Sequence, residues 1–219
     1  MSEIRDQLAK GYQSFRRGKF GEQKDLYERL GTKGQFPKIL LLACADSRVD
    51  PTDIFDAYPG EMFVVRNVAN FMPPMNLPGQ EAGDIAGTAS AVEFAVKALG
   101  VEAIVVMGHE SCGGAAGCLN GLGGMETDYL GKWVALLEPA KEAVLAMDTD
   151  NREREMEFET VRLSLRNLAT YPWIKERIDA GKVELIGAYF SIISAHLLMM
   201  GEDGEFREVA EGSAFSSTF

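Results

Sequence analysis

Two short segments of the sequence carry side chains with which a protein can bind a transition metal. Residues 44–48 read Cys-Ala-Asp-Ser-Arg, and residues 109–114 read His-Glu-Ser-Cys-Gly-Gly. His109 and Cys112 are close enough in sequence to bind one ion from a single turn. Two sulfurs and one nitrogen suit zinc, and three protein ligands leave a fourth position open, as in catalytic zinc sites. We therefore expect Cys44, His109 and Cys112 to bind one zinc ion per chain.

Other interpretations of these side chains must be weighed. A single cysteine at a strand end is usually a small buried hydrophobe, and we interpret Cys118 in this way. For Cys44, His109 and Cys112 the combination favours metal binding. A closed structural zinc site would need a fourth ligand, but His196 lies in a distant predicted strand. A redox motif is disfavoured because Cys112 has no cysteine two residues to either side.

An acidic and a basic residue follow the first cysteine. Asp46 and Arg48 lie two residues apart on one loop, so both side chains can point the same way. Arginine pairs with a carboxylate through two hydrogen bonds and keeps it ionised and oriented. Such a carboxylate can accept a hydrogen bond from a zinc-bound hydroxide, so we predict that Asp46 and Arg48 are catalytic. The alternative is a loop salt bridge without a catalytic role.

Buried strands must bring these segments together. Lys38–Ala43 and Ala103–Met107 are continuous apolar runs, typical of parallel strands that are buried on both faces. Each chemical segment comes just after one of these runs. Because parallel strands end at a common edge where ligands bind, the two segments are expected to meet there.

The remaining sequence predicts an α/β fold. Strands alternate with helices, which indicates a mainly parallel central sheet flanked by helices, preceded by an N-terminal helical arm and closed by an antiparallel edge strand. We expect a single domain, with the arm at residues 1–36 and the core at residues 37–219. The other expected elements are strands at 62–66, 183–190 and 196–200, and helices at 51–55, 84–99, 127–171 (broken near Pro139 and at 148–159) and 172–181. Asp50 and Asp84 are expected helix caps, and residues 67–83 an interface or functional loop.

Composition limits the partners and the location. Hydrophobic residues make up 46% of the 219 residues, and the net charge is −11, which argues against a nucleic acid or an anionic membrane as partner. No apolar run is long enough for a membrane helix, and residues 1–6 lack the character of a signal peptide. Three cysteines in a chain of this size are typical of a reducing compartment, so we expect a cytoplasmic protein.

The two segments together resemble the β-class carbonic anhydrases. The pattern Cys-x-Asp-x-Arg followed by His-x-x-Cys-Gly carries this resemblance, which extends through residues 51–55, 60–70 and 87–94. The resemblance implies reversible hydration of carbon dioxide to bicarbonate and a proton by zinc-bound hydroxide. It also implies a homodimer or homotetramer, formed in part through the arm and the 67–83 loop.

The resemblance assigns a substrate pocket as well. Gln35 resembles the glutamine that contacts substrate or product in the plant-type branch, and Phe63 and Val68 match apolar pocket positions, partly across a dimer interface. Phe94 stands where that branch commonly has tyrosine, and Ala45 where serine is more frequent. These two differences affect pocket polarity and rate, and leave the ligands and the reaction class intact.

Two alternatives to carbon dioxide hydration remain open. Carbonyl sulfide and carbon disulfide hydrolases share this ligand pattern, and pocket width separates them from carbonic anhydrases. A non-catalytic, zinc-stabilised oligomer that senses bicarbonate is the second alternative. Asp46, Arg48 and Gln35 disfavour the sensor, because a purely structural site has no use for an oriented acceptor beside an open metal position.

Overall fold

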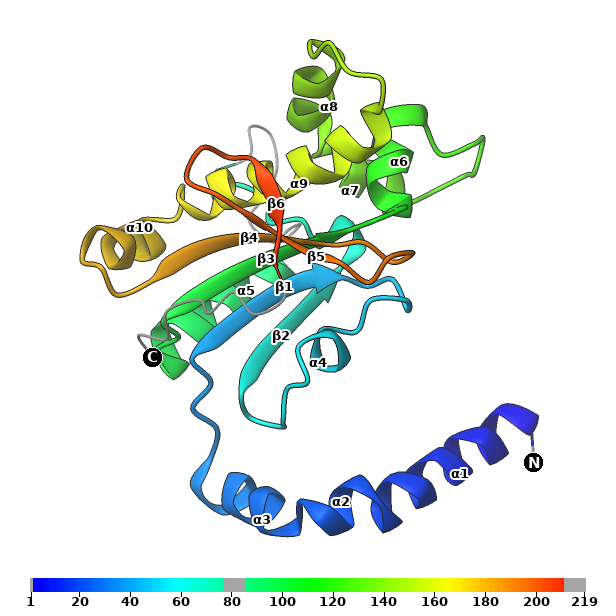
Figure 1. The fold of residues 1–219 in the computed structure, drawn as a ribbon, viewed down its shortest axis with the longest axis vertical. Coiled ribbons are helices and arrows are strands. Elements are labelled where there is room, and N and C mark those ends of the chain that lie inside the picture. The colour runs from blue at the N-terminus through cyan, green and yellow to red at the C-terminus, as the bar shows by residue number, and fades with distance from the viewer. Residues whose placement is uncertain (1, 77–85, 211–219) are drawn as a thin grey trace.

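A six-stranded sheet in the order β2-β1-β3-β4-β5-β6 forms the centre of the protein (Figure 1). The structure is a computed structural model that describes residues 2–76 and 86–210. The strands are β1 (Ile39–Cys44), β2 (Met62–Asn67), β3 (Ala103–His109), β4 (Glu184–Phe190), β5 (Leu197–Met200) and β6 (Phe206–Glu208). The first four are mutually parallel, and β5 and β6 add antiparallel pairs. The predicted α/β fold with an antiparallel edge is therefore confirmed, and β6 is an additional strand that the prediction lacked.

The apolar runs of β1 and β3 lie at the centre of the sheet and are buried on both faces. One face packs against α5 (Ala86–Phe94), the π-helical turn η3 (Ala95–Leu99), α9 (Arg152–Leu168) and α10 (Pro172–Asp179). The other face contributes Leu41, Val105 and Met107 to a cluster that includes residues of α4 (Pro51–Ile54) and its C-terminal end. Burial on both faces fixes the relative position of the two strand ends that carry the chemical segments.

Both central strands extend slightly further than predicted. β1 ends at Cys44 and β3 ends at His109, so these two residues are the last of their strands rather than the first of a loop. The register pairs Ala43 with Met107, which places the two strand ends side by side. Residues at the end of a buried strand are held more firmly than residues of a loop. Cys44 and His109 are therefore fixed by the hydrogen bonds of the sheet.

The N-terminal arm is helical, as expected. It comprises α1 (Glu3–Arg17), α2 (Lys19–Glu22) and α3 (Lys24–Lys33). Phe15, Phe20 and Tyr27 pack on one another and bend the arm, with ring centroids 5.2 to 6.1 Å apart. None of the residues of α1 is buried, and the helix lies apart from the sheet (Figure 1).

The segment after the second metal-binding sequence is helical, and of its two predicted breaks the second is shorter than expected, at residues 146–151. It contains α6 (Gly113–Asn120), α7 (Leu130–Ala135), α8 (Glu138–Leu145) and α9. The predicted break near Pro139 is confirmed, because α7 ends at Ala135 and Pro139 stands in the first turn of α8, where a missing N–H costs nothing. Residues 152–159 belong to α9, which begins after Asn151 accepts a hydrogen bond from the N–H of Arg154 at 3.0 Å.

The predicted cap Asp50 is confirmed, and glycines follow two of the predicted helices. Asp50 accepts a hydrogen bond from the N–H of Thr52 at 2.9 Å and caps α4. Gly100 (φ 71°) and Gly181 (φ 64°) adopt left-handed conformations just after η3 and α10. The expected cap Asp84 and residues 77–83 of the 67–83 loop lie outside the described residues. None of the helices in the described part of the chain has the length and apolar character that a membrane-spanning helix needs.

Candidate metal centre

The structure brings the three predicted ligands together. One ligand atom each from Cys44, His109 and Cys112 lies within 4.8 Å of the other two, and all three residues are buried. Cys44 and His109 come from the ends of neighbouring strands, and Cys112 immediately precedes α6. The first turn of α6 must pass very close to the segment after β2, because a Cβ atom on Gly114 would lie 2.7 Å from a methyl carbon of Val68. Glycine at this position therefore lets the turn approach the strand ends.

The imidazole of His109 is oriented for metal binding. Its Nδ1 lies 2.9 Å from the carbonyl oxygen of Glu110, and since a carbonyl can only accept, Nδ1 carries the proton. Nε2 then presents a lone pair. This atom is buried and has no hydrogen-bond partner in the described part of the chain. The cluster brings a ligand atom of His109 within 4.8 Å of the sulfur atoms of Cys44 and Cys112. A buried nitrogen with a free lone pair beside two sulfurs fits a bound zinc ion.

The electrostatics of the two cysteines favour a thiolate at Cys44. The thiol of Cys112 is the largest influence that lowers the pKa of Cys44, with further contributions from His109 and from the N–H groups of Asp46 and Ala69. The contact with Cys44, together with burial, raises the pKa of Cys112. A metal cation would favour the thiolate form of both cysteines, because the thiolate is the form that binds metal.

Asp46 and Arg48 form the predicted pair. Nε of Arg48 donates to Oδ1 of Asp46 at 2.9 Å, and Nη2 donates to Oδ2 at 2.7 Å. The N–H of Arg48 also donates to Oδ1 at 2.9 Å. This guanidinium holds the pKa of Asp46 well below its usual value, so the carboxylate is ionised. Nη2 of Arg48 also reaches the carbonyl oxygen of Ser111 at 3.0 Å and so joins the two ligand segments.

A second arginine holds the first ligand segment in place. Arg66, in β2, donates to the carbonyl oxygens of Cys44 at 2.9 Å, Asp46 at 2.6 Å and Val49 at 3.3 Å. It also pairs with a carboxylate oxygen of Asp50 at 3.2 Å. The loop that presents Cys44 and Asp46 is therefore fixed by one side chain from the neighbouring strand.

The short helix η1 (Val68–Asn70) is strained beside the cluster. Ala69 (φ 65°) and Asn70 (φ 45°) both adopt left-handed conformations, which cost energy for residues with a Cβ atom. This conformation turns the N–H of Ala69 towards the sulfur of Cys44. The indole N–H of Trp133 donates to the carbonyl oxygen of Val68 at 2.9 Å and supports the strained segment from α7.

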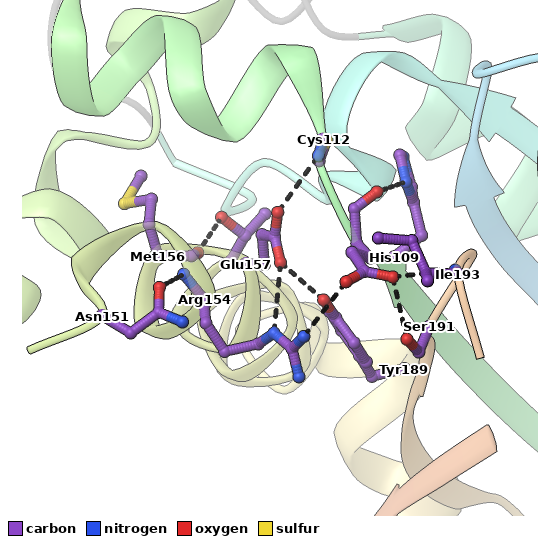
Figure 2. Close-up of polar contacts among 11 residues, drawn as sticks. His109, Cys112, Asn151, Arg154, Met156, Glu157, Tyr189, Ser191 and Ile193 are labelled. Atoms are coloured by element: carbon purple, nitrogen blue, oxygen red, sulfur yellow. Dashed lines mark hydrogen bonds and ion pairs between the residues drawn. The ribbon is translucent and has the colours of Figure 1, made fainter. Parts of the chain in front are cut away.

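A network of charged side chains lies behind the ligands (Figure 2). Glu157 accepts hydrogen bonds from the N–H of Cys112 at 3.1 Å and from the hydroxyl of Tyr189 at 2.6 Å. Glu110 accepts from the hydroxyl of Ser191 at 2.8 Å and from the N–H of Ile193 at 3.0 Å. The guanidinium of Arg154 lies 3.5 Å from Glu110 and 3.8 Å from Glu157, between the two carboxylates.

Not all the predicted pocket residues lie at this centre within one chain. Val68 packs in the same cluster as Cys44 and Cys112. Gln35 is exposed and precedes β1, whereas Cys44 is the last residue of this strand. The two residues therefore lie at opposite ends of β1. Phe63 pairs in register with Leu40, near the start of β1, and its ring contacts Phe94 at 5.8 Å. The structure of one chain therefore separates Gln35, Phe63 and Phe94 from the metal-binding cluster.

The sequence analysis placed Cys118 and His196 outside the cluster. It missed the residues that hold the ligand segments in place. Cys118 is buried and packs, as expected, and His196 is exposed with its Nδ1 3.2 Å from Glu208. The missed residues are Arg66, Glu110, Trp133, Arg154, Glu157 and Tyr189. One signal was available, because Glu157 lies at helical spacing with the inward-facing Val161 and Ser164.

Comparisons with known proteins agree on one family. A family model described as carbonic anhydrase matches residues 39–197. Beta carbonic anhydrase 3 of Arabidopsis thaliana is 31% identical over 195 residues, which cover 86% of this chain and 73% of that protein. The mitochondrial beta carbonic anhydrase 6 of the same plant is 35% identical over 198 residues, which cover 88% of this chain and 66% of that protein.

Solved structures give the same result. The β-carbonic anhydrase CcaA matches with a TM-score of 0.85 and 31% identity, over 95% of this chain and 93% of that one. A β-carbonic anhydrase of Sordaria macrospora, one of two described as tetrameric, matches with a TM-score of 0.78 and 27% identity, over 95% of this chain and all of that one.

Proposed function

This chain belongs to the β-class carbonic anhydrases, which are lyases, and on this premise we propose that it catalyses the reversible hydration of carbon dioxide to bicarbonate and a proton with one zinc ion per chain. One observation carries the proposal. The buried cluster of Cys44, His109 and Cys112 lies beside a carboxylate, Asp46, that an arginine holds ionised and oriented. A metal-binding cluster next to a fixed hydrogen-bond acceptor is what a reaction of water requires.

The donor set fits zinc. When bound, zinc acts as a Lewis acid and lowers the pKa of water to about 7 in well-characterised carbonic anhydrases, so that hydroxide is available at neutral pH. Cys44 and Cys112 would bind through sulfur and His109 through Nε2, since Nδ1 is engaged by the carbonyl of Glu110. Three protein ligands leave one position for the reacting molecule.

Asp46 and Arg48 would act on the reacting water. The carboxylate accepts a hydrogen bond from the O–H group of this water and so directs the remaining oxygen lone pair towards carbon dioxide. Arg48 occupies both carboxylate oxygens on one side and prevents the group from rotating. Because Asp46 stays ionised, it takes no proton in the cycle, and the released proton passes to buffer.

The proposed substrate pocket includes residues from two copies of the chain. Val68 lies at the centre within one chain, and Gln35, Phe63 and Phe94 would be contributed by a second copy. The exposed apolar face of α1, formed by Ile4, Leu8 and Tyr12, supports an assembly of copies through the arm. The description of the Sordaria relatives as tetrameric also supports a homodimer or homotetramer.

Two further parts of the proposal concern substrate and location. We favour carbon dioxide over carbonyl sulfide, carbon disulfide or a bicarbonate-sensing role, because the relatives that this chain resembles are named as carbonic anhydrases. A cytoplasmic location is supported by the free cysteines. One relative is named as mitochondrial, and fractionation of the source cells distinguishes the two compartments.

The test is stopped-flow hydration of carbon dioxide with a pH indicator on protein of known zinc content. We expect fast hydration at about one zinc per chain, and loss of both zinc and activity in Cys44→Ala. Cys118→Ala is the matched control, because this buried cysteine lies outside the cluster, and it should keep both. Full zinc occupancy without hydration would refute the proposal and direct the assay to carbonyl sulfide and carbon disulfide.

A further inference from the structure

A carboxylate is buried directly behind the turn that carries two of the metal ligands. Glu157 lies in the second turn of α9, and its side chain is 7% exposed. Burial raises the pKa of this carboxyl group, while Tyr189, Cys112 and Arg154 oppose the rise. Carboxylates are rarely buried unless they are paired, because leaving water is costly for them. The contacts of Glu157 must therefore offset the free-energy cost of its burial.

The contacts of Glu157 lead to the ligand Cys112. Oε1 accepts a hydrogen bond from the N–H of Cys112 at 3.1 Å, and Oε2 accepts from the hydroxyl of Tyr189 at 2.6 Å (Figure 2). Cys112 precedes α6 and follows Ser111, which has a left-handed conformation (φ 57°). Because Cys112 stands before the first turn of α6, its N–H has no acceptor within that helix, and Glu157 accepts its hydrogen bond instead.

The same network extends to the second ligand of this turn. His109 is oriented by the carbonyl oxygen of Glu110, and the carboxylate of Glu110 is fixed by Ser191 and by the N–H of Ile193. Arg154 lies between Glu110 and Glu157 and joins the two supports. A change at Glu157 would thus loosen the turn on which both His109 and Cys112 lie.

We propose that Glu157 is a positioning residue for the metal centre, which holds the Cys112 turn through the backbone N–H and thereby slows the release of zinc. This inference rests on the proposed zinc site and goes beyond it, since it concerns how firmly the metal is held. Residues behind metal ligands typically change metal affinity by about 10- to 100-fold when they are replaced. The role requires a hydrogen-bond acceptor at this position, so glutamine should preserve it and leucine should abolish it.

The test measures the rate at which the zinc-loaded full chain releases zinc to a coloured chelator. Glu157→Leu should release zinc at least about tenfold faster than wild type, and Glu157→Gln should stay close to wild type. Glu159→Leu is the matched control, because Glu159 is an equally buried carboxylate of α9 that pairs with Arg162 and Arg166 instead of the turn. It should lower thermal stability without faster zinc release.

A spectroscopic measurement separates positioning from general destabilisation. In cobalt-substituted protein, the thiolate-to-cobalt absorption should shift in Glu157→Leu and stay unchanged in Glu159→Leu, because the first variant moves a sulfur ligand. A zinc release rate of Glu157→Leu equal to that of wild type would overturn the inference. A release rate of Glu157→Gln or of Glu159→Leu as fast as that of Glu157→Leu would overturn it too. A wild-type chain that binds no zinc would instead refute the proposed function.

A second pair of variants applies if Glu157→Leu does not fold. Tyr189→Phe removes the hydroxyl that fixes Oε2 of Glu157 and should release zinc faster than wild type. Tyr171→Phe is the control, because Tyr171 is also buried and its hydroxyl binds the remote carbonyl oxygen of Pro73 at 3.0 Å. Equal release rates in these two variants would overturn the inference.

Discussion

Arg48 binds both carboxylate oxygens of Asp46, with Nε 2.9 Å from Oδ1 and Nη2 2.7 Å from Oδ2. Nη2 also lies 3.0 Å from the carbonyl oxygen of Ser111, which belongs to the other ligand segment. One guanidinium therefore fixes the orientation of the proposed acceptor relative to the metal-binding turn. The planar, forked shape of arginine makes this three-way contact possible, and the single point charge of lysine cannot reproduce it.

Replacement of Arg48 should impair catalysis without removing the metal. In Arg48→Lys the charge remains, but the carboxylate can rotate, and misplacement of a reacting group by about 1 Å can cost about 100-fold in rate. We expect a loss of kcat/KM for carbon dioxide hydration of that order at unchanged zinc content, measured by stopped flow. Arg207→Lys is the control, since Arg207 forms a similar two-point pair with Asp203 far along the chain, after β5. Equal activity of Arg48→Lys and wild type would contradict the role of the pair.

Asp50 should contribute to loss of stability in acid. Its pKa is lowered in the folded protein, first by the hydroxyl and N–H of Thr52 and then by Arg66. Because the unfolded value is about 3.9, this stabilisation is complete above about pH 5 and is lost as the pH falls through 3.9 towards the folded pKa. Asparagine keeps the helix cap but does not titrate.

The measurement is Tm as a function of pH for wild type and Asp50→Asn. The variant should be less stable at neutral pH, where its pairing with Arg66 is lost, and the difference should narrow between about pH 5 and about pH 3. Asp25→Asn, which removes an exposed carboxylate of α3, is the charge-matched control. A constant difference in Tm across this range would show that Asp50 contributes no titrating stabilisation.

Trp133 should support the strained segment beside Cys44. Trp133→Phe retains an aromatic ring against Phe71 but leaves the carbonyl oxygen of Val68 without its donor. The loss of one such hydrogen bond costs about 1 kcal/mol, which lowers Tm by roughly 2–4 °C in a chain of this size. We also expect a severalfold lower hydration rate at full zinc content, because Ala69 donates to the Cys44 sulfur from this segment.

The control for this variant is Trp173→Phe in α10, which packs against Tyr171 and beside Lys97. It should change stability without changing the rate per zinc. If the two tryptophan variants have equal rates per zinc, η1 does not depend on the indole of Trp133.

Features that depend on residues close together in the sequence can be predicted from it, and features that depend on contacts between distant segments cannot. The apolar runs of β1 and β3 and the cap Asp50 act within a few residues, and the structure confirms them. The ligand set could be proposed because parallel strands end at one edge, whatever the exact register. The strand ends themselves were missed by one or two residues, because hydrogen bonding with neighbours rather than local composition decides where a strand stops.

The residues behind the ligands could not be found in the same way. Glu157 is 45 positions after Cys112 along the chain, and the contact arises because α9 packs against the end of β3. Arg66 likewise binds backbone carbonyl groups, which leave no trace in the sequence of the loop that it holds. The separation of Gln35 and Phe63 from the centre is also a property of the folded chain, and it leads to the last prediction.

The exposed face of α1 should hold copies of the chain together and thereby complete the pocket. Leu8 is 69% exposed and Tyr12 is 58% exposed, one helical turn apart, although both are apolar enough to favour burial. In the double variant Leu8→Glu/Tyr12→Glu, two added charges should prevent this contact. Light scattering should then show a mass that falls to that of one 23.9 kDa chain.

Loss of assembly should also reduce hydration, because Gln35, Phe63 and Phe94 lie away from the metal-binding cluster of their own chain. Zinc content should be unchanged, since all three ligands belong to one chain. Leu145→Glu is the control, as Leu145 is half exposed on α8 and its replacement should leave both mass and rate unaltered. A monomeric double variant with the full wild-type rate would refute a pocket shared between copies, because each chain would then provide every group that the reaction needs.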